Sequence, residues 1–292
     1  MRPCDYALTS ILLFCLCACS EAPKPTSEAQ TYARIVTLAP NLTELVFAAG
    51  AGEALVGVSA YSDYPPQALQ LPIIGDAFVV DQEQLALLQP DLLLVWESGT
   101  PAHVVDELRR IGYSVEVVRT RSLVDVAIAL RRIGELTGHD GGAGRVARSY
   151  EENLQAIREE YADLEDVRVF YQVSRRPLYT VNGEHYVSEL IELCGGSNVF
   201  ADLNDLAPMV DVEAVVERNP ELMLASSDAG AEAFAEWRRW PHIAANRYQN
   251  HFLMPADSIG RATPRLAAAG EAVCVAMQEA RKRRSLADAE RQ

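Results

Sequence analysis

Two stretches of the chain decide its architecture because they repeat each other. Residues 80–85 (VDQEQL) run on to residues 90–94 (PDLLL), and residues 210–215 (VDVEAV) run on to residues 220–224 (PELML). Matched positions in the two stretches lie 130 residues apart throughout. The shared spacing of the acidic residues, the proline and the apolar run predicts two α/β units of similar build.

A second echo supports the first. Residues 43–46 (TELV) precede Gly50, and residues 188–191 (SELI) precede Gly195, both at an offset of 145. The alternative is that an acidic helix followed by proline and an apolar strand is common in any α/β protein. We favour duplication, which places a crevice between the units, and small-molecule sites often lie at such interfaces.

Strand-like apolar runs alternate with helical patterns along the chain, as in residues 34–38 and 55–59. This alternation predicts parallel sheets covered on both faces. The predicted fold class is α/β, with two Rossmann-like parallel-sheet lobes joined by a single long backbone helix. A single helical link predicts a clamp with little hinge motion. We place the N-terminal lobe at 33–138, the linking helix at 139–165, the C-terminal lobe at 166–284 and a disordered tail at 285–292.

Local signals predict where particular helices begin and end. Asn41 with Glu44 three positions later has the form of a helix N-cap and capping box. The glycine-rich residues 137–144 predict a break, with the linking helix starting at about Arg145. The last helix is expected from Pro264 to about Arg283, where its basic end suits the helix dipole.

The overall charge argues against one class of partner. The 292 residues carry a formal net charge of −15, which would repel the phosphates of nucleic acid. Apolar residues make up 49% and charged residues 23%, as expected for a globular protein with room for two cores.

The N-terminus has the pattern of a targeting segment. Residues 11–18 form an apolar run too short to span a bilayer, as in the core of a signal peptide. The run ends in LCACS at residues 16–20, which resembles the lipobox of bacterial lipoproteins with Cys19 as the lipidated residue. We therefore predict a lipoprotein signal peptide at 1–19 and a flexible tether at 20–32. An ordinary cleaved signal peptide is the alternative.

Four of the six cysteines lie in or at the end of this leader, which leaves Cys194 and Cys274 in the folded part. Two remaining cysteines in an exported protein most simply form one disulfide, and two buried thiols are the alternative. No Cys or His stands at metal-ligand spacing to either of them.

Sequence signatures of catalysis are missing. The chain has no Gly-x-Ser-x-Gly elbow and no His-Glu-x-x-His motif. Its five histidines are scattered, at positions 103, 139, 185, 242 and 251. We expect no enzymatic activity and no metal site. An α/β enzyme, marked by a cleft with a catalytic pair of perturbed pKa, is the alternative from a different class.

Several motifs together resemble one family. They are residues 37–44 (TLAPNLTE), 56–68 (VGVSAYSDYPPQA), 90–92 (PDL), 193–200 (LCGGSNVF) and 261–265 (RATPR). In this order they resemble the periplasmic cobalamin-binding proteins of ABC importers, within the wider group that binds haem, siderophores and corrinoids. The resemblance covers roughly residues 33 to 280, and YSDYPPQA is its most specific piece.

The resemblance implies roles for particular residues. Tyr61 matches a tyrosine that packs on the corrin ring, Trp96 an aromatic of the same wall, and Tyr179 an aromatic of the opposite lobe. The loop from Asp257 through Ser258, Ile259 and Gly260 to Arg261 matches the segment at the ligand's polar edge, and Pro40 and Phe78 complete the expected set. Core packing is the alternative for Trp96 and Tyr179. The family pattern departs at Ala77 and Ala207, where tryptophans are expected.

The resemblance also implies contacts with partners. Glu83 and Glu213, one at the start of a helix in each lobe, match two glutamates that dock onto arginines of a permease dimer. Complementation of a helix dipole is the alternative for both. The same comparison pairs Cys194 with Cys274.

The resemblance therefore implies a monomeric substrate-binding component of an ABC transporter. It is expected to capture cobalamin or a related corrinoid between its lobes, with no cofactor of its own, and to deliver it to the permease. The predicted location is the periplasm, anchored through Cys19, or soluble in the periplasm as the alternative. A haem or iron–siderophore binding protein of the same fold is the competing prediction, with Arg175, Arg176, Arg261 and Arg265 available for an anionic ligand.

Overall fold

The computed structural model describes residues 31–161 and 163–290. Its N-terminal lobe holds a parallel sheet of four strands in the order β2-β1-β3-β4. The elements of this lobe are β1 (Ile35–Thr37), α1 (Pro40–Ala48), β2 (Leu55–Val58), α2 (Gln82–Leu88), β3 (Leu92–Trp96), α3 (Ala102–Arg110), β4 (Val115–Val118) and α4 (Leu123–Thr137).

The C-terminal lobe holds a second four-stranded parallel sheet, in the order β10-β9-β5-β8. Its elements are β5 (Arg168–Gln172), a hairpin of β6 (Ser174–Arg175) and β7 (Leu178–Tyr179), α6 (Tyr186–Leu193), β8 (Ser197–Asn198), α7 (Val212–Arg218), β9 (Leu222–Ser226), α8 (Ala244–Arg247), β10 (His251–Met254), α9 (Ala256–Ile259) and α10 (Leu266–Ala289). When the four main strands of each lobe are numbered in chain order, both sheets have the same strand order, 2-1-3-4.

The repeated sequence gives repeated structure. Helices α2 and α7 begin and end at positions 130 residues apart, and so do strands β3 and β9. Asp81 caps α2 by accepting a hydrogen bond from the backbone N–H of Gln84 at 2.9 Å, and Asp211 caps α7 through Ala214 at 2.7 Å. The predicted fold class, two parallel-sheet lobes of similar build, is confirmed.

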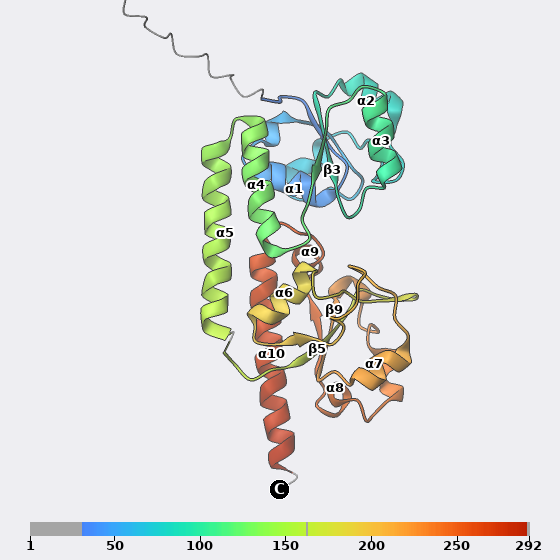
Figure 1. Cartoon of the computed structure of the whole chain (residues 1–292), viewed down its shortest axis with the longest axis vertical. Helices are drawn as coiled ribbons and strands as arrows, with labels where there is room; N and C mark the ends of the chain where they lie inside the picture. The colour runs from blue at the N-terminus through green and yellow to red at the C-terminus, as the bar shows by residue number, and fades with distance from the viewer. Residues whose placement is uncertain (1–30, 162, 291–292) are drawn as a thin grey trace, which may run out of the picture.

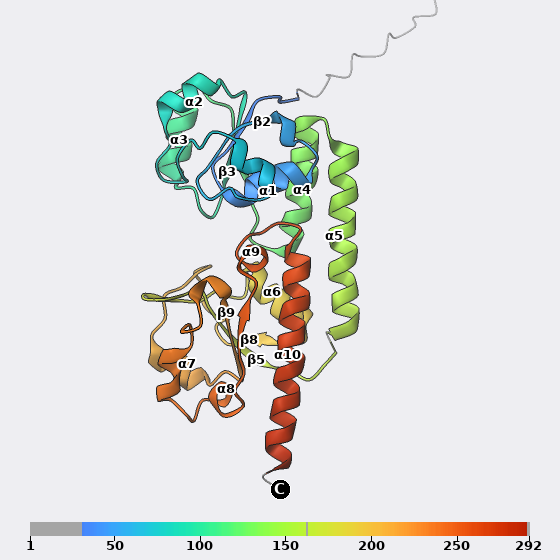
Figure 2. The ribbon, with the colours of Figure 1, turned by 180° about the vertical axis from the view of Figure 1, so that it is seen from behind.

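The lobes are stacked along the long axis of the molecule and share one side made of helices (Figures 1 and 2). Helix α5 (Asp140–Tyr161) links them and packs against α4, α6 and α10. A single apolar cluster runs from Leu42 and Leu45 of α1 through Ile133 and Ile157 to Val273 of α10. Because both lobes contribute to one core, separating them would expose apolar surface.

The predicted break before the linking helix is too long. Gly138 alone ends α4, in the left-handed conformation at φ 73°, and α5 already begins at Asp140. Gly141, Gly142 and Gly144 lie inside its first turns. Asp140 in the first turn favours this start because an acid interacts well with a helix N-terminus.

Two further expectations are wrong. Helix α1 starts at Pro40 and is flanked by Ala39 with no side-chain cap, so Asn41 and Glu44 form no capping box. Proline suits the first helical position, which moves the start one residue ahead of Asn41. Residues 285–289 belong to α10 and not to a disordered tail, since the segment contains no glycine or proline to end the helix.

The disulfide between Cys194 and Cys274 is present, with an S–S distance of 1.98 Å, and joins the end of α6 to α10. The predicted signal peptide, Cys19 and most of the tether lie outside the described residues. Within residues 31–161 and 163–290, no helix is both long and apolar enough to span a bilayer.

Candidate functional site

The carboxyl ends of the two sheets point toward each other. Helix α4 follows β4 and helix α9 follows β10 along the chain, and the start of α4 and the whole of α9 lie in the region between the lobes (Figures 1 and 2). On the C-terminal side, a hollow of about 490 Å³ lies at the ends of β5 and β9. Ligands of open α/β sheets bind outside the carboxyl ends of strands, so the region between the facing strand ends of the two lobes, called the crevice below, is the candidate site.

The N-terminal wall presents Tyr61 on the loop after β2. Its side chain is 81% exposed, and its backbone lies at φ 65°, in the left-handed region that tyrosine rarely adopts. Arg261 of the other lobe donates a hydrogen bond from Nη2 to the carbonyl oxygen of Tyr61 at 3.0 Å. An exposed aromatic side chain held in an uncommon backbone conformation is typical of a ligand contact.

Phe78 projects from the neighbouring loop and is 68% exposed. The carboxylate of Asp76 accepts hydrogen bonds from the backbone N–H groups of Phe78 and Val79, both at 2.8 Å. The N–H groups of Val79 and Phe78 lower the pKa of Asp76. The backbone N–H of Ala60 donates to Gly75 at 2.7 Å, which ties this loop to the one that carries Tyr61.

Trp96 and Pro40 are less accessible than Tyr61 and Phe78. Trp96 ends β3 and is partly buried against the shared core, with its indole so close to Gly99 that a Cβ there would lie 2.2 Å from the ring. Its indole N–H is buried and has no hydrogen-bond partner among the described residues. Pro40 is partly buried in the first turn of α1. Core packing, the alternative for Trp96, therefore accounts for much of its surface.

The C-terminal wall is built on the β6–β7 hairpin. Tyr179 ends this hairpin, is partly buried, and pairs in an antiparallel bridge with Met209. Met209 is 67% exposed, although the sequence patterns did not single it out. Hydrogen bonds from Thr180 to Pro208 at 3.1 Å and from Val210 to Leu178 at 3.0 Å hold the two segments together.

The loop 257–261 divides into exposed and buried positions. Asp257 and Gly260 are exposed, whereas Ser258 and Ile259 are buried in helix α9. The Ser258 hydroxyl donates to the carbonyl of Pro255 at 3.2 Å, and the Ile259 carbonyl accepts from the Tyr186 hydroxyl at 3.2 Å. Because both side chains are buried, and Ile259 belongs to the shared apolar core, they support the loop and offer little surface to a ligand.

The sequence patterns also left out polar residues of the C-terminal wall. The hollow at the ends of β5 and β9 is lined among others by Ser174, Ser226 and Asp228, and also by Arg175, which the sequence suggested only for an anionic ligand. Their positions at or just after the carboxyl ends of buried strands are the signal that could have identified them.

Arg261 belongs to an ion-pair cluster between the lobes. Its Nη1 lies 2.8 Å from Oε1 of Glu44 and 2.6 Å from Oδ1 of Asp63. Arg265 donates to both oxygens of Glu44, at 2.6 and 3.0 Å, and stacks over the ring of Tyr64 with its guanidinium carbon 4.1 Å from the ring centre. The hydrogen bond from Arg261 lowers the pKa of Asp63. Burial acts against the charge of Arg261, but hydrogen bonds to Asp63 and Glu44 outweigh it and raise its pKa.

Glu83 and Glu213 lie apart from this crevice wall, in the first turns of α2 and α7. Both side chains are exposed, and the two helices lie on the side of the molecule opposite α5 (Figures 1 and 2). Each glutamate is placed to interact with its own helix dipole, and each is accessible to a partner.

Within the described part of the chain, no group of three or more His, Cys, Asp or Glu side chains is placed to hold a metal ion. His185 serves the fold, because its Nδ1 accepts a hydrogen bond from the backbone of Val187 at the start of α6. Burial lowers the pKa of His185 to about 4, which keeps it neutral.

Two α/β lobes with facing strand ends and a helical link define a two-lobed solute-binding protein. The chain belongs to the periplasmic binding protein family, which matches residues 35–258. This confirms the family expected from the motifs.

Individual relatives narrow the comparison. The chain is 35% identical over 250 residues to the vitamin B12-binding protein of Vibrio cholerae, covering 85% of this chain and 90% of the relative. The crystal structure of the periplasmic vitamin B12-binding protein BtuF of Vibrio cholerae matches with a TM-score of 0.79 at 34% identity, covering 86% of this chain and 98% of that one. The periplasmic haem-binding protein RhuT of Roseiflexus shares the fold, with a TM-score of 0.74 at 24% identity over 85% of this chain and 98% of that one.

Proposed function

We propose that this protein captures cobalamin or a related corrinoid between its two lobes and delivers it to a membrane ABC permease. The observation that carries the proposal is the 35% identity to a vitamin B12-binding protein over 85% of the chain. The chemistry of the crevice supports it. A corrinoid is a wide, largely neutral disc with amide groups at its rim, so it suits apolar faces combined with a few polar groups.

The apolar faces come from both lobes. Tyr61 and Phe78 are exposed on neighbouring loops of the N-terminal wall, and Met209 is exposed beside Tyr179 on the C-terminal wall. Asp257, Asp228 and Gly260 supply polar groups at the carboxyl ends of the C-terminal sheet. The metal of such a ligand is part of the cargo, and no side chain of the protein is required to coordinate it.

The charges of the crevice disfavour an anionic siderophore. All four arginines considered for that role already have partners: Arg261 and Arg265 bind Glu44, Arg175 donates to the carbonyl of Glu232 at 2.9 Å, and Arg176 lies 4.0 Å from Glu236. The carboxylates of Glu44 offset the charges of Arg261 and Arg265, which makes these two arginines less available to an anion. Haem remains the second candidate ligand, since haem-binding proteins share this fold.

Two further features of the chain are proposed to serve delivery to the permease. Glu83 and Glu213 are proposed to meet arginines on the permease, one from each lobe, which fixes the orientation of docking. Lipidation of Cys19 is proposed to keep the protein at the membrane surface of the periplasm.

Titration calorimetry of the purified protein with cyanocobalamin, cobinamide and haemin tests the ligand. We expect binding of at least one corrinoid with a 1:1 stoichiometry and weaker or no binding of haemin. Binding of haemin alone would replace the proposed ligand by the second candidate. A protein that binds none of the three would refute the proposal.

A further inference from the structure

The second sequence repeat, at an offset of 145, contains two glutamates that each bind the opposite lobe. Glu44 of α1 and Glu189 of α6 occupy equivalent positions in the two lobes, 145 residues apart. Each lies in the first helix that follows the first strand of its lobe, and each binds an element of the opposite lobe.

Glu44 reaches from the N-terminal lobe to the start of α10. Its side chain is 3% exposed, and its two oxygens accept hydrogen bonds from Arg261 and Arg265 at distances of 2.6 to 3.0 Å. Arg261 also binds the carbonyl of Tyr61 at 3.0 Å. The loop that carries Tyr61 is thereby held against the C-terminal lobe.

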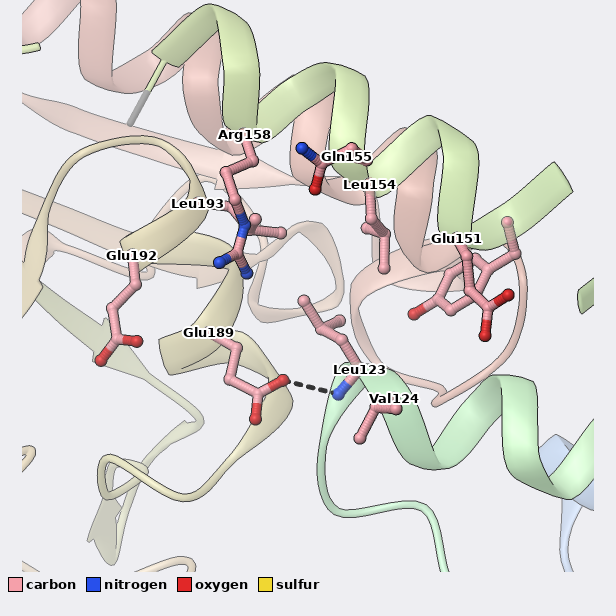
Figure 3. Close-up of a pocket in the computed structure, with 10 residues that line it drawn as sticks. Leu123, Val124, Glu151, Leu154, Gln155, Arg158, Glu189, Glu192 and Leu193 are labelled. Carbon is pink, nitrogen blue, oxygen red and sulfur yellow. Dashed lines mark hydrogen bonds between the residues drawn. The ribbon is translucent and has the colours of Figure 1, made fainter. Parts of the chain in front are cut away.

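Glu189 reaches in the opposite direction, from the C-terminal lobe to the start of α4. Its Oε2 accepts a hydrogen bond from the backbone N–H of Leu123 at 2.6 Å, as Figure 3 shows. The glutamate borders a hollow of about 610 Å³ between α4, α5 and α6, with Arg158 and Glu192 beside it. Helix α4 follows the fourth strand of its lobe as α10 follows the fourth main strand of the other. The two glutamates therefore bind equivalent elements reciprocally.

We propose that Glu44 and Glu189 are positioning residues that together hold the two walls of the crevice at the separation required for ligand capture. The proposal rests on the proposed function, because it assigns these residues a role in binding the same ligand. Together with the shared core and the hydrogen bond from the Tyr186 N–H to the Arg121 carbonyl at 2.7 Å, these two contacts restrict rotation of one lobe against the other. A ligand that must touch both walls then finds them already in place, and this reduces the ordering required on binding.

The geometry offers a matched pair of variants at Glu189. Glu189→Gln keeps an oxygen that accepts from Leu123, whereas Glu189→Ala removes it. Glu44→Gln retains the size of the side chain but loses the charge shared by the two arginines. Glu192→Gln serves as a control, because Glu192 is exposed on the same helix and its side chain makes no hydrogen bond among the described residues.

Two measurements are made on each variant. The first is the distance distribution between spin labels at Ala86→Cys on α2 and Glu217→Cys on α7, both exposed, in a chain whose cysteines up to residue 19 are serine. The second is the dissociation rate of cyanocobalamin by stopped flow. We expect Glu44→Gln and Glu189→Ala to broaden the distribution and to raise the dissociation rate about tenfold, since walls that are free to separate release the ligand more readily, and losses of affinity appear mainly in the dissociation rate. Glu189→Gln and Glu192→Gln should behave like the wild type.

The outcomes separate this proposal from the function on which it rests. If the wild type binds neither corrinoid nor haemin, the proposed function is wrong, and the spin-label distances still decide whether the glutamates fix the lobes. If folded Glu189→Ala keeps a narrow distribution and a wild-type dissociation rate, the positioning role is refuted. Should Glu44→Gln fail to fold in a thermal melt, the comparison of Glu189→Ala with Glu189→Gln decides alone.

Discussion

Replacing Tyr61 by alanine should weaken corrinoid binding without affecting the fold. A tyrosine side chain offers about 200 Å² of surface. With 81% of Tyr61 exposed, and a ligand covering one face of the ring, about 80 Å² would be buried on binding, worth about 2 kcal/mol. This corresponds to a dissociation constant about 30-fold higher for Tyr61→Ala. Since the ring makes few contacts within the protein, the melting temperature should stay within about 2 °C of the wild type.

The assay is calorimetric titration with cyanocobalamin, combined with a thermal melt of each protein. Leu87→Ala is the matched control, because Leu87 is nearly as exposed but lies on α2 and should leave the affinity unchanged. Tyr61→Gly tests the backbone separately, since glycine adopts a positive φ without strain. An affinity for Tyr61→Ala within about twofold of the wild type would contradict the placement of this ring at the ligand.

Three further predictions concern stability and docking. Replacing Cys194 and Cys274 by alanine should lower the free energy of unfolding by about 4.5 kcal/mol, because the bridge closes a loop of 80 residues. Urea unfolding measures this difference. In the wild-type protein, alkylation without reductant should find no thiol at either position. Reversing both charges with Glu83→Arg and Glu213→Arg should abolish uptake but leave ligand affinity intact; unchanged uptake refutes the docking role. Asp125→Asn should destabilise the protein by about 1 kcal/mol at neutral pH. Burial would raise the pKa of Asp125, but hydrogen bonds from Ser122 and Arg121 outweigh it and lower the pKa. A lowered folded-state pKa stabilises the protein above the unfolded value, so the difference from Asn should shrink as the pH falls below 3.8; a difference independent of pH would contradict this.

The repeat at an offset of 130 predicted the architecture because each copy contains the local sequence signals that form its helix and strand. Asp81 and Asp211 cap their helices, and the apolar runs after Pro90 and Pro220 become β3 and β9. These features depend on neighbours in sequence and could be read without knowing the tertiary structure. The disulfide was within reach because only two cysteines remain after the leader.

The wrong or missing predictions share a different cause. Glu44 matched a capping box by spacing, but its partners Arg261 and Arg265 are more than 200 positions away. Ile259 stood in a loop expected at the ligand, yet the direction of its side chain depends on the packing of α9. The sequence did not predict a role for Met209, because its place depends on a bridge to Tyr179. Tyr179 belongs to the β6–β7 hairpin, which has little sequence signature. Long-range pairing decides which side of a loop faces the crevice, and local patterns do not carry that information.

The exposed apolar side chains of the crevice are suited to ligand binding because hydrogen bonds hold the segments that carry them in place. An exposed Phe or Met on a flexible loop would lose conformational freedom when a ligand bound, and that loss would reduce the affinity. Here the loop of Phe78 is fixed by two hydrogen bonds to Asp76, and Met209 is held beside Tyr179 by backbone pairing. The loop of Tyr61 is held by Arg261, which is itself held by Glu44. Much of the conformational freedom of these loops is therefore lost during folding. Less is lost when the ligand binds, so more of the favourable contact free energy contributes to affinity.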